Sequence, residues 1–201
     1  LAYRLGDGRL DKQSIRKALD EFRPTQLYGL EIENSVDASL QDVIGKKKEV
    51  DKLKKILNVY KNQKLCRQLG LKRSNLLLFS GGCGVGKSFM TRALAGEAAF
   101  PLLKINASDI FSMGPFEGIY RITQMAKSYP NVVLFIDEAE KLIGNARFGE
   151  DNLLIAELSK GLDDPEIKSL LVLAVNETNR FGEAFLDRFT HIQFDYPKFE
   201  E

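Results

Sequence analysis

Eight residues beginning at Gly81 have the types and spacing needed to bind phosphate groups. The sequence Gly81-Gly-Cys-Gly-Val-Gly-Lys-Ser88 fits the pattern G-x-x-x-x-G-K-[ST]. Glycines let the backbone curl so that successive N–H groups point at phosphate oxygens, and a helix that starts here adds the positive end of its dipole. We expect Lys87 to reach the β- and γ-phosphates of a nucleotide and the Ser88 hydroxyl to bind Mg²⁺. The candidate nucleotide-binding residues of this loop are Gly82, Cys83, Gly84, Val85, Gly86, Lys87, Ser88 and Phe89.

Two carboxylates, Asp137 and Glu138, directly follow five apolar residues that start at Val132. A buried strand would deliver this pair to the edge of a sheet. We interpret Asp137 as a second group that supports Mg²⁺ and Glu138 as the residue that orients and polarises the attacking water, because phosphoryl transfer depends mainly on positioning and charge stabilisation. A strand that ends in two acids is unspecific by itself. About fifty residues after a phosphate loop, it indicates hydrolysis of a nucleotide such as ATP.

The elements that must position these residues alternate between strand and helix from residue 75. Expected strands cover 76–80, 102–106, 132–137, 170–176 and 191–194, and expected helices cover 88–99, 118–128 and 151–161. Continuous apolar strands between helices indicate a parallel sheet covered on both faces, with ligands at the carboxyl ends of its strands. We therefore predict an α/β fold of the P-loop NTPase type, a three-layer sandwich with a five-stranded parallel sheet.

The N-terminal part of the chain has a different pattern. Apolar residues at helical spacing predict a short helix from Asp11 to Phe22, ended by Pro24, and residues 25–44 are expected to be a linker with short extended pieces. A further helix is expected from Lys46 to about Cys66. We interpret its initial lysines as a solvated first turn rather than a phosphate-binding patch. The chain is thus divided into an N-terminal helical and linker segment, residues 1–36, and an α/β domain, residues 37–201.

Composition restricts the class of protein. The 201 residues are 44% apolar and 28% charged, with a net charge of +1, which fits one globular domain and gives no support for a general nucleic-acid binder. No apolar run approaches the ~20 residues that a membrane span requires. Two cysteines and one histidine argue against a disulfide framework and a structural zinc site. We expect an intracellular protein in a reducing compartment.

The phosphate loop and the acidic pair, together with their surroundings, resemble the AAA+ ATPases over roughly residues 37–197. The stretch from Asp37 to Gly45 looks like the family segment whose backbone contacts adenine. The resemblance assigns this contact to Val43, Ile44 and Gly45. Val43 and Ile44 can be ordinary core residues at the same time.

The resemblance also assigns roles near the C-terminus. Leu170–Asn176 looks like the strand that ends in the family's γ-phosphate sensor, and Asn176 fits this role better than Asn179 because it ends the apolar run. Arg188 matches an arginine finger, which acts on the nucleotide of the next subunit. A neighbouring arginine common in the family is Asp187 here. The alternative for Arg188 is a surface ion pair with Asp187 or Asp195.

The resemblance implies ATP and Mg²⁺ as ligands, a protein substrate or adaptor, and a homo- or hetero-oligomeric ring, a hexamer in typical members. Two features depart from the family. The stretch Phe111–Gly118, at the position of the substrate-threading loop, lacks the expected aromatic, although Met113 or Phe116 could serve. The chain ends at Glu201, where the family's helical lid would begin, so we expect the lid to be missing.

These features support ATP-driven remodelling of a protein partner as the first hypothesis. The second is a nucleotide-binding scaffold or switch with little hydrolysis, which the departures favour. A nucleic-acid motor is the third, and only the short lysine run supports it.

Overall fold

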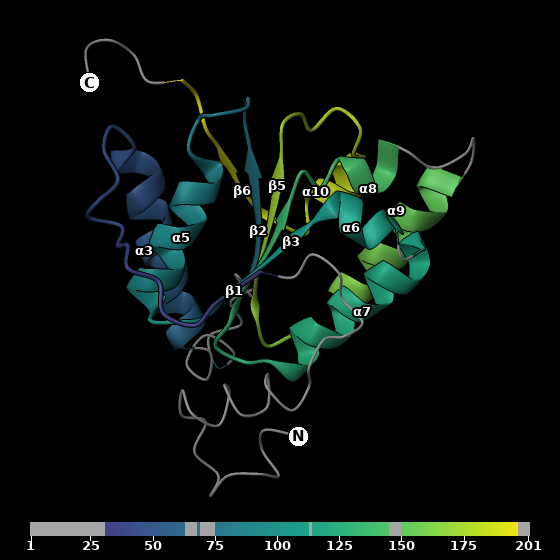
Figure 1. Ribbon diagram of the computed structural model, residues 1–201, viewed down its shortest axis with the longest axis horizontal. Helices are drawn as coiled ribbons and strands as arrows, with labels where there is room; N and C mark the ends of the chain where they lie inside the picture. Colours follow the sequence, from purple (N-terminus) through teal and green to yellow (C-terminus); the bar gives the residue numbers. More distant parts are fainter. Residues whose placement is uncertain (1–30, 63–67, 69–74, 113, 145–149, 197–201) are drawn as a thin grey trace, which may run out of the picture.

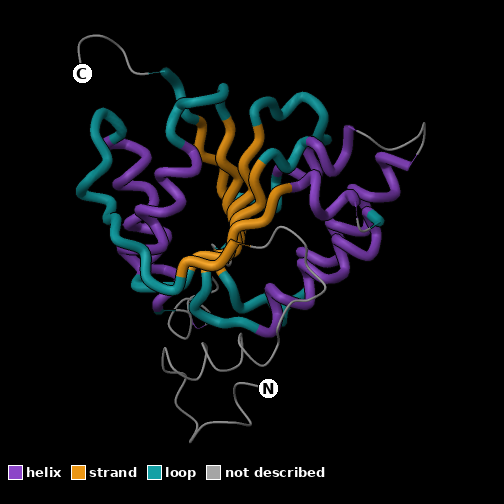
Figure 2. Tube along the Cα trace, viewed as in Figure 1, coloured by secondary structure: helices purple, strands orange, loops and turns teal. Residues whose placement is uncertain are grey.

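Six strands form one sheet in the order β1-β3-β4-β5-β2-β6. The computed structural model describes residues 31–62, 68, 75–112, 114–144 and 150–196, so the helix expected at 11–22 lies outside the described residues. Figure 1 shows the sheet edge-on between two groups of helices, and Figure 2 shows the same three layers coloured by secondary structure. The predicted α/β sandwich is confirmed.

Five of the strands are parallel, as the sequence predicts. β3 pairs with β4, β4 with β5, β5 with β2 and β2 with β6, all in parallel. These five strands are β2 Leu76–Ser80, β3 Leu102–Asn106, β4 Val133–Asp137, β5 Leu170–Val175 and β6 Thr190–Gln193.

A sixth strand, β1 Glu31–Glu33, adds to the five expected ones and runs antiparallel to β3 at the edge of the sheet. It corresponds to one of the short extended pieces expected between residues 25 and 44, and it precedes residue 37. Two ion pairs accompany it, Lys104–Glu31 at 3.6 Å and Arg92–Glu33 at 3.2 Å. A strand of three residues is too short to show an alternating pattern in the sequence. Its conformation depends on pairing with β3.

The helices divide between the two faces of the sheet (Figure 1). One face is covered by α3 Lys47–Lys61 and α5 Lys87–Ala98. The other face is covered by α6 Ala107–Ser112, α7 Pro115–Ser128, α8 Lys141–Gly144, α9 Glu150–Leu162 and α10 Glu183–Leu186. Among these, α7 begins three residues before its predicted start, because Pro115 has the fixed backbone angle that suits a first helical turn.

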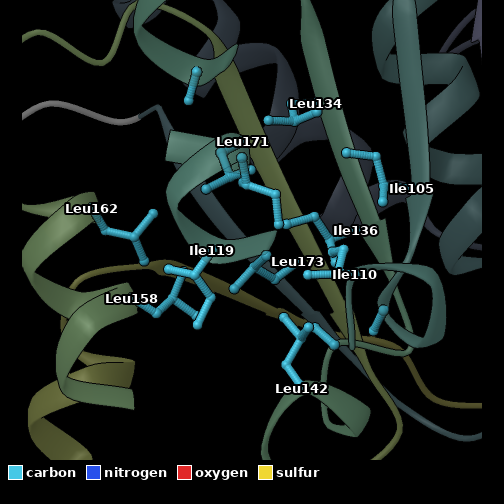
Figure 3. Close-up of a cluster of buried hydrophobic side chains, with 14 of the residues drawn as sticks. Ile105, Ile110, Ile119, Leu134, Ile136, Leu142, Leu158, Leu162, Leu171 and Leu173 are labelled. Atoms are coloured by element: carbon cyan, nitrogen blue, oxygen red, sulfur yellow. The ribbon is translucent and has the colours of Figure 1, made fainter. Parts of the chain in front are cut away.

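The four inner strands of the sheet, β3, β4, β5 and β2, each contribute side chains to two separate cores. In β4, Leu134 and Ile136 belong to the cluster under α6–α10, whereas Val133 and Phe135 belong to the cluster under α3 and α5. Figure 3 shows the first cluster, where Ile119, Leu142 and Leu158 of three helices lie against the sheet. Burial on both faces explains why these strands read as continuous apolar runs rather than alternating ones. No helix in the described part of the chain is long and apolar enough to cross a membrane.

Candidate nucleotide-binding site

The sheet order places three chain segments side by side at one edge. Ser80 at the end of β2 pairs with Val175 at the end of β5, and β5 also pairs with β4. Residues that follow these strands, namely Gly81, Asn176 and Asp137, therefore emerge next to one another. This juxtaposition was expected for the phosphate loop and the acidic pair.

The phosphate loop runs from Gly81 to Gly86, between β2 and α5. Gly81, Gly84 and Gly86 have positive φ angles of 145°, 80° and 99°, a backbone region that favours glycine. Gly81 has a second reason to be glycine, since a Cβ atom there would lie 2.3 Å from the carbonyl oxygen of Phe194. Gly86 precedes α5 and offers no side chain to cap it, so the N-terminal N–H groups of the helix can serve an anion.

Lys87 is only 8% exposed and points back into this loop. Its ammonium group donates to the carbonyl oxygens of Gly81 at 2.5 Å and Gly82 at 2.9 Å, and to Asn176 Oδ1 at 3.0 Å. The lysine charge is thus held among neutral acceptors rather than by a carboxylate. This arrangement leaves the charge available to a phosphate group.

Ser88 and Asp137 face each other across the site. The Ser88 hydroxyl lies 3.3 Å from Asp137 Oδ2, although the two residues are 49 positions apart. A hydroxyl and a carboxylate are hard oxygen donors of the kind that Mg²⁺ takes, while keeping most of its water ligands. The residues present therefore fit the magnesium ion that the sequence predicts.

Glu138 has a left-handed backbone with φ of 52°, and its N–H donates to Asp137 Oδ1 at 3.0 Å. Its Oε2 atom accepts from Lys141 at 2.5 Å and from Asn106 at 3.4 Å. The hydrogen bond from Lys141 lowers the pKa of Glu138, so this carboxylate stays ionised. An ionised carboxylate is suited to hold and polarise a water molecule. Sequence reasoning did not find Lys141 or Asn106, since neither lies in a recognisable motif.

Asn176, rather than Asn179, lies at the phosphate loop. Besides its contact with Lys87, Asn176 Nδ2 donates to Glu140 Oε1 at 2.6 Å. Asn179 is exposed and donates to Glu177 at 3.0 Å. The structure thus brings Asn176, and not Asn179, to Lys87, and its role as a sensor stays a prediction.

The segment assigned to adenine contact has mixed surroundings. Val43 packs against the core under α3 and α5, whereas the Ile44 side chain is 87% exposed, and Gly45 has φ of 73°. Ile44 is therefore not a core residue. Phe89, in the first turn of α5, is 44% exposed.

Tyr196 is a loop contact that the sequence did not reveal. Its hydroxyl donates to the carbonyl oxygen of Cys83 at 3.0 Å, and a Cβ atom on Gly82 would lie 2.7 Å from the same hydroxyl. The preceding Asp195 accepts from Lys46 through its carbonyl oxygen. The segment after β6 thus ties the phosphate loop to the start of α3, a contact between residues more than a hundred positions apart.

Arg188 forms an ion pair within its own chain. Its Nε and Nη2 atoms donate to the two carboxylate oxygens of Asp163 at 2.8 and 2.9 Å, and Nη1 donates to the carbonyl oxygen of Ala184. Asp163 raises the pKa of Arg188 further, so the guanidinium keeps its charge. The partners considered from sequence, Asp187 and Asp195, are wrong, because the end of α9 lies closer.

The stretch Phe111–Gly118, which departs from the family's threading loop, is partly described. Phe116 is 47% exposed at the start of α7, and Gly118 is close to α6, where a Cβ atom would lie 2.1 Å from the Ile110 side chain. Met113 lies outside the described residues.

The geometry is that of a P-loop domain, with the Asn176 amide and the acidic pair beside the phosphate loop. The sequence profile of the ATPase family associated with various cellular activities (AAA) matches residues 77–196, more than half of the chain. The chain therefore belongs to the AAA family of ATP-hydrolysing enzymes.

Relatives with assigned names are similar over this region. The m-AAA protease component AFG3L1 of the mitochondrial inner membrane in Mus musculus is 30% identical over 55% of this chain and 14% of its own length. The ATP-dependent zinc metalloprotease FtsH of Methylibium petroleiphilum is 29% identical over 77% of this chain and 27% of its own length. A probable inactive ATP-dependent zinc metalloprotease of Arabidopsis chloroplasts, FTSHI 4, is 24% identical over 82% of this chain and 20% of its own length. The chain thus spans about a quarter or less of each of these relatives.

Proposed function

We propose that this chain binds ATP together with Mg²⁺ and hydrolyses it to remodel a protein partner. The observation that carries the proposal is the placement of Lys87, buried between the loop carbonyls and Asn176, beside the Ser88–Asp137 pair. Lys87 binds the β- and γ-phosphates, and the loop N–H groups bind their oxygens. Ser88 and Asp137 hold Mg²⁺, which when bound neutralises charge on the phosphate oxygens.

In the proposed reaction, the oxygen of a water molecule bonds to the γ-phosphorus while the bond to the oxygen shared with the β-phosphate breaks. The products are ADP and inorganic phosphate, and the proton of the water leaves with the phosphate or to solvent. Glu138 orients and polarises the water. Its lowered pKa makes it a weak proton acceptor, so positioning is its main contribution.

The first test is the Glu138→Gln variant of the full-length protein. Glutamine keeps the shape of the side chain and removes its charge, so we expect ATP affinity within about threefold of wild type and turnover reduced at least about 100-fold. Affinity is measured with a fluorescent ATP analogue and turnover by phosphate release. The matched control is Glu177→Gln, an exposed carboxylate beside Asn176, which should change neither. Unchanged turnover in Glu138→Gln would contradict the assignment.

A protein as the substrate is supported by the relatives, whose names describe ATP-dependent proteases. The near-neutral charge of the chain gives no support for nucleic acid. We expect an unfolded protein such as casein to stimulate turnover and DNA or RNA to leave it unchanged. Stimulation by nucleic acid alone would favour a nucleic-acid motor. The proposal concerns ATP hydrolysis alone.

A second candidate function is a nucleotide-binding switch with little hydrolysis. The ion pair between Glu138 and Lys141 favours it, because it engages the carboxylate that would hold the water. Turnover indistinguishable from that of Glu138→Gln, with intact ATP binding, would support the switch.

We further propose that the protein works as a homo- or hetero-oligomeric ring, in an intracellular, reducing compartment. The retained charge of Arg188, whose side chain is 28% exposed, supports an action on a neighbouring nucleotide. The free, exposed thiol of Cys83 in the phosphate loop supports the compartment, since oxidation there would obstruct nucleotide binding. Labelling of Cys83 in intact cells by a membrane-permeant maleimide, without labelling by an impermeant one, is the expected result.

A further inference from the structure

Glu140 lies two residues after Glu138, and neither the motif nor the mechanism above uses it. Its Oε1 atom accepts from Asn176 Nδ2 at 2.6 Å. Its Oε2 atom is buried and has no hydrogen-bond partner among the described residues. A buried carboxylate oxygen without a partner costs free energy. Among the described residues, the hydrogen bond to Asn176 is the favourable interaction that accompanies this cost.

The turn after β4 brings Glu140 to this position. Glu138 adopts the left-handed conformation, and the N–H of Ala139 then donates to the carbonyl oxygen of Ala174 at 2.8 Å. Because β4 and β5 are neighbours, this bond folds the turn over the end of β5, where Asn176 follows Val175. Two backbone constraints therefore place the Glu140 carboxylate against the Asn176 amide.

The chemistry of the three groups permits only one orientation of that amide. The Lys87 ammonium can only donate, and it lies at Asn176 Oδ1. The Glu140 carboxylate accepts through its Oε1 atom, which lies at Asn176 Nδ2. With the amide turned over, both contacts would be lost. The Nδ2 group carries a second hydrogen, which remains able to donate to a phosphate oxygen or a water.

We propose that Glu140 is a positioning residue, which holds the Asn176 amide with its donor side available to the γ-phosphate of ATP. The inference rests on the proposed ATP-binding function. In the proposed function Lys87 binds the phosphates, which leaves Glu140 as the contact that fixes the amide. Without the acceptor-only carboxylate, the amide can then turn over and present Oδ1, which repels phosphate oxygens. Glu140 thereby contributes to the preference for ATP over ADP, because only ATP has the γ-phosphate.

The charge of Glu140 alone predicts the opposite effect on nucleotide affinity, so the experiment can distinguish the two explanations. Removing a negative charge near the site should, by itself, strengthen binding of an anionic nucleotide. Loss of amide positioning should weaken binding of the triphosphate and leave the diphosphate unaffected. The variant Glu140→Gln separates the two effects, because glutamine has the same shape and can both donate and accept.

The experiment measures dissociation constants of fluorescent ATPγS and ADP for the full-length wild type, Glu140→Gln, Asn176→Ala and the double variant. We expect Glu140→Gln to weaken ATPγS binding about tenfold and to change ADP binding less than about twofold. In the Asn176→Ala background, Glu140→Gln should have no further effect, since Glu140 acts through Asn176. Glu177→Gln is the matched control and should behave as wild type.

Three outcomes would overturn the inference: an unchanged ratio of the two constants, tighter ATPγS binding, or additive effects in the double variant. Thermal unfolding of each variant shows whether it folds. If the glutamine variant does not fold, Glu140→Ala, which also removes the acceptor, takes its place and is expected to show the same loss of ATPγS affinity. If the wild type fails to bind ATPγS, the proposed function fails with it. Binding by the wild type with no effect of Glu140 overturns the positioning role alone.

Discussion

At the scale of single residues, His191 shows how surroundings change an ordinary side chain. It lies in β6, where its Nε2 atom and the Ser80 hydroxyl are 2.5 Å apart, and its carbonyl oxygen accepts from Lys52 at 2.6 Å. Burial, and then the charge of Lys52, hold the pKa of His191 below its ordinary value. Ser80 directly precedes the phosphate loop, so this pair joins the loop to the last strand of the sheet.

The lowered pKa of His191 predicts a pH dependence of stability. In the folded protein His191 stays neutral at a pH where the unfolded chain already binds a proton, so the unfolded state binds more protons below about pH 6.5. Stability should therefore fall as the pH drops through this range. We expect wild type to lose more stability than His191→Gln between about pH 7.5 and about pH 5.5, measured by urea unfolding. Equal losses would show that His191 makes no such contribution, since the carboxylates titrate alike in both proteins.

At the scale of elements, the phosphate loop and β6 depend on each other. The N–H of Phe194 donates to the carbonyl oxygen of Ser80 at 2.7 Å, and its own carbonyl oxygen occupies the space beside Gly81. The side chain of Phe194 is buried against Phe79 of β2, with ring centroids 5.1 Å apart. Glycine at position 81 is thus required by the sheet as well as by the phosphate loop.

The close approach at Gly81 predicts the cost of a single methyl group. Gly81→Ala would place Cβ against backbone that cannot move without breaking the β2–β6 contact, so we expect a loss of at least about 2 kcal/mol of unfolding free energy. Gly82→Ala is the control, because its added Cβ meets only the end of the exposed Tyr196 side chain, and it should cost less than about 1 kcal/mol. Both values come from urea unfolding. Similar losses in the two variants would contradict this explanation.

At the scale of the whole molecule, the described domain holds its own Lys87, Asp137 and Glu138 at one edge and Arg188 in a separate ion pair. The pair lies at the surface, with the Arg188 and Asp163 side chains 28% and 55% exposed, and we expect Arg188 to be able to leave Asp163 when another acceptor is offered. A neighbouring subunit can then receive it. The proposed ring requires such an exchange, because a finger acts on the nucleotide of another copy.

This requirement predicts complementation between two inactive proteins. Arg188→Ala keeps its own water-positioning Glu138 but supplies no finger, whereas Glu138→Gln supplies a finger but cannot hydrolyse. We expect turnover in the mixture to exceed the sum of the separate rates at least about threefold, measured by phosphate release. Asp163→Asn, which frees Arg188 without removing it, should remain active alone. A mixture no faster than its components would show that Arg188 does not act in trans.

The features formed by residues that are neighbours in the chain could be predicted from the sequence. The glycines and Lys87 of the phosphate loop follow one another, and the buried strand before Asp137 is apolar on both faces. Repeated apolar patterns marked five parallel strands and three of the helices between them to within a few residues.

Contacts between distant residues were decided by the tertiary structure. The strand β1 forms because it pairs with β3. Arg188 pairs with Asp163 rather than Asp187 because α9 ends beside Arg188. Glu140 reaches Asn176 across 36 positions through a turn that no local pattern reveals. The sequence by itself determined which groups could bind and cleave a nucleotide, since their spacing is local. Only the tertiary structure decided which carboxylate orients which amide, because hydrogen bonds depend on distance and direction in space.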